Sequence, residues 1–205
     1  SVMALGAEVI LVLNASPYSH DKPEKREQVV VRQVLKHQVP MAYVNLVGGQ
    51  DELVFDGDSM LFSREGVRIL RAPLFESGVF FGNLPIDHIE PPAAATYQHE
   101  TLEAHVYKAL VTGVRDYVRK NGFKGVLLGL SGGIDSSLTL AIAADALGAE
   151  NVEAIMMPFR YTAAMSVEDA AEQARMMGVK YRQIPIEPIY ESFVQSLAPE
   201  FVGFK

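Results

Sequence analysis

Residues 126–147 read VLLGLSGGIDSSLTLAIAADAL, and this stretch decides the fold of the second half of the chain. The apolar run 126–130 is typical of a buried strand, and the Ala-rich run 136–147 is typical of a helix. The adjacent glycines between them permit positive φ angles, so successive amide N–H groups can point into one concavity. The sequence therefore predicts a strand, an anion-binding loop and a helix whose positive N-terminal end faces the same concavity.

The loop carries groups that suit a phosphate chain and its metal ion. Ser131, Ser136 and Ser137 supply hydroxyls. Asp135 would repel phosphate unless a cation lies between them, which makes it a candidate Mg²⁺ ligand. The predicted phosphate-binding loop comprises Gly129, Leu130, Ser131, Gly132, Gly133, Ile134, Asp135 and Ser136. The alternative is a plain strand-to-helix turn, in which the glycines serve geometry and Asp135 or Ser136 is the N-cap.

The regions after this loop continue the alternation of strands and helices. We expect strands at 152–156 and 179–184 and helices at 100–120, 167–177 and 189–197, the first of them with apolar residues recurring every three or four positions. Ser166 followed by Asp169 indicates a capping box at the start of the helix 167–177. Alternating elements with short connections predict βαβ units and a parallel sheet covered by helices.

The first half has a different order of predicted strands and helices. We expect a strand at 9–13, a helix that begins near Pro23 and is ended by Pro40, and a strand at 41–47 stopped by Gly48-Gly49. A hairpin follows, with strands at 59–62 and 67–70. Pro91-Pro92-Ala-Ala-Ala95 is the best linker candidate. The predicted organisation is a first domain at 1–90, a linker at 91–98 and a second domain at 99–205.

Composition excludes several classes of protein. The chain has 205 residues with a net charge of −7, and no basic stripe that would bind nucleic acid. No apolar run approaches the ~20 residues that cross a bilayer, so we expect no membrane partner. Without cysteine, disulfides, Cys-based zinc sites and thiol nucleophiles are excluded for this chain. The apolar start and the absence of a closing element lead us to expect an internal fragment of a longer protein.

Two stretches resemble known families. Residues 131–136, SGGIDS, resemble the SGGxDS loop of the ATP pyrophosphatase superfamily. Residues 14–18, residues 43–57 and the hairpin after them resemble the C-terminal part of a nitrilase-type glutaminase domain. The combination resembles glutamine-dependent NAD⁺ synthetase. The resemblance implies an α/β fold: the end of a nitrilase-like α-β-β-α sandwich, then the start of a doubly wound, parallel-sheet domain like those of adenine nucleotide alpha hydrolases.

The resemblance also implies an activity. It implies ATP-dependent amidation of deamido-NAD to NAD⁺ through an acyl-adenylate, with release of AMP and PPi and with ammonia from glutamine. The loop would hold the pyrophosphate of ATP, and Asp135 would bind Mg²⁺. Ser16 and Lys22 match family positions that hold glutamine. The glutaminase Cys, Glu and Lys would lie upstream, which leaves no catalytic residue in this chain, and we expect the isolated chain to be inactive. The family suggests a cytoplasmic homo-oligomer.

Other hypotheses remain open from the residues. The chain could belong to another SGGxDS enzyme that modifies tRNA or aminates a nucleotide, although such relatives do not usually carry a nitrilase-like half. It could also be a non-catalytic module that binds nucleotides. Ser16 could be a turn residue before Pro17, and Lys22 a surface residue at the start of a helix.

Overall fold

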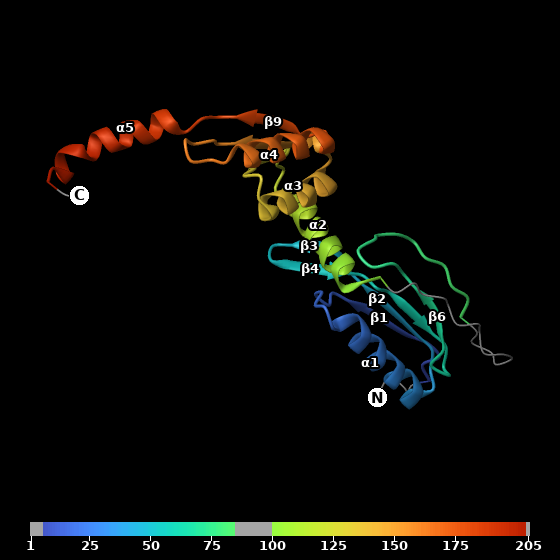
Figure 1. Cartoon of the computed structure of the whole chain (residues 1–205). Coiled ribbons are helices and arrows are strands. Elements are labelled where there is room, and N and C mark those ends of the chain that lie inside the picture. The colour runs from blue at the N-terminus through green and yellow to red at the C-terminus, as the bar shows by residue number, and fades with distance from the viewer. Residues whose placement is uncertain (1–5, 85–99, 204–205) are drawn as a thin grey trace. The chain divides into compact units, whose positions relative to one another are not determined.

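The computed structural model describes residues 6–84 and 100–203. It forms two compact units, Ser1–Tyr117 and Val118–Lys205, and the division lies within helix α2 (Leu102–Lys120) (Figure 1). The predicted linker at 91–98 lies outside the described residues. The predicted domain limits of 1–90 and 99–205 therefore stay a prediction.

The first unit is built on a four-stranded mixed sheet with the strand order β1-β2-β5-β6. Strand β1 (Ile10–Asn14) pairs in parallel with β2 (Met41–Asn45), and helix α1 (Lys22–His37) connects these two strands. Strand β5 (Met60–Phe62) pairs with β2 in antiparallel fashion, and β6 (Arg68–Arg71) pairs with β5 in the same way. The strand predicted at 9–13, the helix and the hairpin predicted at 59–70 are thus present, with ends that shift by a few residues.

The core of this unit lies between α1 and one face of the sheet, and Figure 1 shows α1 running along that sheet. Alternate residues of a strand point to the same face, which brings inward-facing residues of β2 and β5 against the apolar stripe of the helix. Phe62 is 1% exposed and Val34 is completely buried. The buried cluster comprises Val30, Val34, Met41, Tyr43, Met60 and Phe62.

A second, two-stranded sheet corrects one sequence prediction. The strand predicted at 41–47 ends at Asn45, and a hairpin of β3 (Val47–Gln50) and β4 (Leu53–Asp56) follows. Gly48-Gly49 lies inside β3 and does not stop a strand. The reason is close packing: a Cβ on Gly49 would lie 3.2 Å from the Cα of Gly113 in helix α2. Glycine in a strand often marks such a close approach of another backbone.

The second unit contains a three-stranded parallel sheet in the order β7-β8-β9. Strand β7 (Val126–Gly129) pairs with β8 (Val152–Met156), and β8 pairs with β9 (Lys180–Gln183). Helix α3 (Ile134–Leu147) connects the first two strands, and α4 (Ala164–Met177) connects the second and third. The parallel α/β arrangement predicted for this half is confirmed.

Three shorter features complete the second unit. A 3-10 turn (Ala149–Asn151) precedes β8, and helix α5 (Glu187–Leu197) leads into a second 3-10 turn (Ala198–Phe201). No residue of α5 is buried among the residues described here, and Figure 1 shows this helix extending away from the sheet of its own unit.

The capping box predicted at Ser166 is wrong. Helix α4 begins at Ala164, and its N-cap is Ala163, which makes no side-chain capping bond. The amide of Ser166 already donates to the carbonyl of Ala163 at 3.1 Å, so Ser166 lies inside the first turn. An N-cap residue needs a non-helical backbone, which Ser166 does not have.

Within residues 6–84 and 100–203, the structure contains no helix with the length and apolar character needed to span a bilayer.

Candidate functional site

The glycine loop connects the end of β7 to the start of α3. The amide of Leu130 donates to the carbonyl of Ile155 at 2.9 Å, which ties the start of the loop to strand β8. Gly132 has a φ of +79°, whereas Gly133 has a φ of −89° and is the N-cap of α3. One glycine, not two, therefore adopts the left-handed backbone that the sequence allows.

Gly132 is also the point where the loop contacts helix α4. A Cβ at this position would lie 2.1 Å from the carbonyl oxygen of Ser166. A side chain at residue 132 would therefore collide with main-chain atoms, which cannot move aside as the end of a flexible side chain can. The loop therefore requires glycine at residue 132, because of its positive φ angle and because the carbonyl of Ser166 leaves no room for a side chain.

Two of the predicted hydroxyl donors brace the loop internally. The amide of Ser131 donates to Ser136 Oγ at 3.2 Å, and the amide of Gly133 donates to Ser131 Oγ at 3.3 Å. Ser136 Oγ donates to the carbonyl of Gly133 at 2.9 Å. These amides are satisfied by hydroxyls of the loop itself, so the anion-binding capacity must come from elsewhere in the loop.

The first turn of α3 supplies that capacity. The amide of Ser137 bonds to the carbonyl of Gly133 at 3.1 Å. Among the described residues, no hydrogen-bond acceptor is found for the amides of Ile134, Asp135 and Ser136. Unpaired amides at a helix N-terminus carry partial positive charge and bind anions. The residues predicted from the motif are therefore brought together at a site suited to phosphate oxygens.

Asp135 places a carboxylate beside these amides. Its side chain is exposed. Within the described parts of the chain, no group of three or more His, Asp or Glu side chains could hold a metal ion. Mg²⁺ is commonly held by one or two carboxylates together with phosphate oxygens and water. Asp135 fits that pattern as a single protein ligand.

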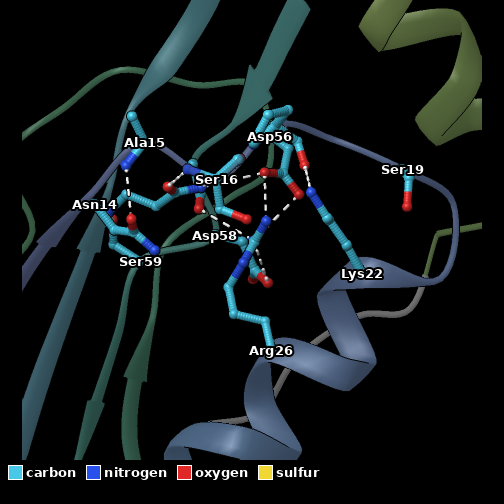
Figure 2. A network of polar contacts seen from close by, with 12 residues as sticks. Asn14, Ala15, Ser16, Ser19, Lys22, Arg26, Asp56, Asp58 and Ser59 are labelled. Atoms are coloured by element: carbon cyan, nitrogen blue, oxygen red, sulfur yellow. Dashed lines mark hydrogen bonds and ion pairs between the residues drawn. The ribbon is translucent and has the colours of Figure 1, made fainter.

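Of the second predicted pair, Ser16 lies on the connection between β1 and α1, and Lys22 is the first residue of α1 (Figure 2). The amide of Ser16 donates to Asn45 Oδ1 at 2.8 Å. Lys22 Nζ donates to the carbonyl of Pro17 at 2.9 Å, which folds this side chain back over the connection. The amide of Tyr18 bonds to the carbonyl of Val54 at 2.7 Å. The connection is thus fixed along the edge of β4.

Both side chains keep hydrogen-bonding capacity. Ser16 Oγ has no hydrogen-bond partner in the described parts of the chain, and Lys22 Nζ has one acceptor for its three N–H donors. A hydroxyl and an ammonium are groups that bind carboxylates. Both predicted residues therefore keep hydrogen-bonding capacity for an anionic ligand.

Sequence reasoning missed the buried charges beneath this connection. Asp56 and Asp58 are completely buried. Arg26 of α1 binds Asp56 through two hydrogen bonds of 2.9 and 3.2 Å and reaches Asp58 at 3.4 Å. Arg71 binds Asp58, with one bond of 3.0 Å, and also pairs with Glu27 at 3.1 Å. Each buried carboxylate is therefore paired with an arginine.

Burial controls two pKa values in this region. Burial raises the pKa of Asp58 above its ordinary value, although Arg71 and Arg26 act in the opposite direction. Burial also raises the pKa of Tyr18, and the negative charge of Asp56 adds to that shift. The sequence contains only a weak indication that polar residues are buried here. Met41, Tyr43 and Asn45 occupy alternate positions of β2, so the polar Asn45 lies on the same buried face as the two apolar residues.

The first unit contains a cavity of about 710 Å³. Apolar side chains of the sheet, such as Leu13, Val44 and Leu61, form much of its wall together with Val79 and Phe80 of the segment after β6. Asn45 and Asp58 also line the cavity, whereas Ser16 and Lys22 do not.

Comparisons with known proteins agree with the resemblance that the sequence indicates. Residues 106–204 match the family model described as NAD synthase. The chain is 48% identical to the glutamine-dependent NAD(+) synthetase of Acinetobacter baylyi over 96% of its length, and 42% identical to that of Xylella fastidiosa over 97%. It spans 36% and 37% of the length of these two proteins, about a third in each case.

Solved structures show the same relationship. The glutamine-dependent NAD⁺ synthetase of Acinetobacter baumannii, solved in complex with ADP, matches with a TM-score of 0.85 and 44% identity, over 100% of this chain and 39% of that one. The enzyme of Cytophaga hutchinsonii matches with a TM-score of 0.78 over 97% of this chain and 39% of that one. At 19% identity, this second match shows the fold alone. The resemblance of the chain to glutamine-dependent NAD⁺ synthetases is thus confirmed.

Proposed function

We propose that this chain is part of an enzyme that amidates deamido-NAD to NAD⁺ with ATP, using ammonia released from glutamine. The observation that carries the proposal is the SGGIDS loop, which leaves three helix N-terminal amides and Asp135 at one point, in a chain similar to glutamine-dependent NAD⁺ synthetases over nearly its whole length. The ADP bound by the Acinetobacter baumannii protein supports a nucleotide as ligand.

The chemistry explains why such an enzyme needs this loop. Ammonia cannot displace oxide from the nicotinate carboxylate of deamido-NAD. Transfer of AMP from ATP to that carboxylate forms an acyl-adenylate and releases PPi. Attack by ammonia then forms the amide and releases AMP. Negative charge builds on the departing PPi, and the amides of Ile134, Asp135 and Ser136 stabilise it because they are fixed before the reaction.

Asp135 is the proposed protein ligand of Mg²⁺. When bound, Mg²⁺ neutralises phosphate charge and favours departure of PPi. The carboxylate of Asp135 would hold the ion beside the amides of its own helix turn. The hydrogen bonds between Ser131 and Ser136 keep this turn in one conformation.

Ser16 and Lys22 are the proposed glutamine contacts. The Lys22 ammonium complements the α-carboxylate of glutamine, and Ser16 offers a hydroxyl. Hydrolysis of glutamine in the family uses a cysteine thiolate, and this chain contains no cysteine. The nucleophile would therefore belong to residues outside this chain, as would its Glu and Lys partners. We accordingly expect the 205 residues alone to turn over neither glutamine nor deamido-NAD.

The finer architecture belongs to the same proposal. The first half would be the end of a nitrilase-like α-β-β-α sandwich, and the second half would be the start of a doubly wound domain. A homo-oligomeric, cytoplasmic enzyme is the state that we expect for the complete protein.

The test is NAD⁺ formation by the complete enzyme that carries this chain, supplied with ATP, Mg²⁺, deamido-NAD and glutamine. We expect equal amounts of NAD⁺, AMP and PPi. Asp135→Asn should lower the rate with either glutamine or ammonia as nitrogen donor, whereas Lys22→Met should lower the rate with glutamine alone. A wild-type enzyme that makes no NAD⁺ from deamido-NAD would overturn the proposal.

A further inference from the structure

Both polar atoms of the buried side-chain amide of Asn45 form hydrogen bonds. Asn45 is 6% exposed. Its Oδ1 accepts the amide N–H of Ser16 at 2.8 Å, and its Nδ2 donates to the carbonyl of Ser16 at 3.4 Å and to Asp56 Oδ1 at 3.3 Å. A donor faces the oxygen and acceptors face the nitrogen, so the side chain has one favourable orientation. Asn45 thereby holds Ser16 by both of its main-chain polar groups.

Asp56 is itself fixed from the opposite side. Figure 2 shows Arg26 reaching from α1 to Asp56, below the connection that carries Ser16. The guanidinium meets both carboxylate oxygens, and both residues are at most 7% exposed. A bidentate pair of this kind is rigid as well as strong. The orientation of Asp56, and through it that of Asn45, is set by helix α1.

The other end of the connection is anchored by the same helix. Lys22 is the first residue of α1 and binds the carbonyl of Pro17, next to Ser16. Helix α1 therefore reaches Ser16 by two routes. The shorter route is the hydrogen bond from Lys22 to the carbonyl of Pro17, the residue after Ser16. The longer route is a chain of hydrogen bonds through Arg26, Asp56 and Asn45.

From these contacts we infer that Asn45 is a positioning residue for the glutamine-binding connection: it fixes Ser16 relative to Lys22, and the Arg26–Asp56 pair holds Asn45 in place. This inference rests on the proposed role of Ser16 and Lys22 in binding glutamine. Asn45 does not touch the ligand in this scheme. Its contribution is a pre-ordered pair of contacts, because a connection that is ordered before binding loses less freedom when glutamine arrives.

The experiment compares nitrogen donors in the complete enzyme. Asn45→Leu preserves the approximate size of the side chain and removes its hydrogen bonds to Ser16. We expect the KM for glutamine to rise about five- to tenfold, the equivalent of one or two net hydrogen bonds, and the rate with ammonia to stay unchanged. Asn45→Ala serves as a second variant in case leucine impairs folding. We expect it also to raise the KM for glutamine and to leave the rate with ammonia unchanged.

Glu27→Gln is the matched control. Glu27 belongs to the same charged network, and within the described parts of the chain its hydrogen bonds and ion pairs go to Arg68 and Arg71. This variant should lower the midpoint of thermal unfolding and leave the KM for glutamine unchanged. Ser16→Ala and Lys22→Met should each raise that KM.

Two results would overturn the inference while leaving the proposed function intact. One is an unchanged KM for glutamine in both Asn45 variants when Ser16→Ala raises it. The other is an equal fall in the glutamine and ammonia rates, which indicates a general folding role for Asn45. If Ser16→Ala and Lys22→Met both leave the KM for glutamine unchanged, the assigned glutamine contacts are wrong and the inference falls with them.

Discussion

Gly132→Ala adds one methyl group at the most constrained point of the phosphate loop. Residue 132 has a φ of +79°, and the new Cβ would lie 2.1 Å from the carbonyl oxygen of Ser166 and 2.8 Å from its carbonyl carbon. Both atoms belong to the main chain in the first turn of α4. The loop must therefore move away from α4 or change its φ angle, and either change displaces the amides at the start of α3.

The magnitude follows from these two effects. A residue with a Cβ pays about 1–2 kcal/mol for the left-handed conformation. The overlap with Ser166 adds to that cost, so we expect the loop to lose at least about 2 kcal/mol, or roughly 30-fold in its local opening equilibrium. Gly133→Ala is the matched control. Residue 133 has a φ of −89°, and its Cβ would lie 3.4 Å from Ser131 Oγ, an ordinary contact. The expected cost is about 0.5–1 kcal/mol, because alanine is a poorer N-cap than glycine.

Hydrogen–deuterium exchange followed by mass spectrometry measures this difference directly. Peptides that cover residues 126–147 should exchange about 30-fold faster in Gly132→Ala and about two- to fivefold faster in Gly133→Ala. The affinity for ATP with Mg²⁺ should fall markedly in the first variant and little in the second. Equal exchange rates in the two variants would refute the argument, because they would show that neither the φ angle nor the contact with Ser166 constrains the loop.

Three further predictions concern the first unit. The stability of the wild type relative to Asp58→Asn should increase as pH falls toward 4. Burial raises the folded-state pKa of Asp58, so in this pH range the folded wild type binds a proton more readily than the unfolded chain does, and the variant has no such group. Urea unfolding of both proteins across this pH range checks the sign, and a stability difference that moves the other way in acid would show that the arginines control the pKa of Asp58. Asp116→Ala removes the acceptor of the 2.8 Å bond from the amide of Gly49 and should cost about 1–2 kcal/mol, measured by urea unfolding against Asp116→Asn, which keeps an acceptor oxygen. Phe62→Ala should cost about 3–5 kcal/mol, because the ring is 1% exposed and leaves a cavity, and a loss below 1 kcal/mol in circular dichroism melts would contradict this packing.

Local patterns predicted the second unit well. A strand is predicted at 152–156, and β8 has those same limits. The β3–β4 hairpin could not be predicted in the same way. Gly48 and Gly49 are poor strand residues by themselves, and they suit β3 because α2 packs on them from 67 positions further along the chain. Contacts at such separation leave no local signal.

The candidate site was also predicted only in part. The motif predicted a loop between a strand and a helix, and the structure has that loop between β7 and α3. The motif could not tell that Gly132 alone needs a positive φ, since that depends on the position of Ser166. It also could not show that Ser131 and Ser136 bond to the loop itself. Asn45 and Asp56 escaped notice because buried polar residues acquire meaning only from the partners that the fold supplies.

Isothermal titration of the chain with ATP, in the presence and absence of Mg²⁺, measures whether the first turn of α3 and Asp135 hold the phosphates of ATP through main-chain amides and Mg²⁺. Wild type and Asp145→Asn, an exposed acid near the other end of the same helix, should bind ATP more tightly with Mg²⁺. Asp135→Asn should lose at least about tenfold in affinity and most of the Mg²⁺ dependence. Unchanged, Mg²⁺-independent binding by Asp135→Asn would contradict the account.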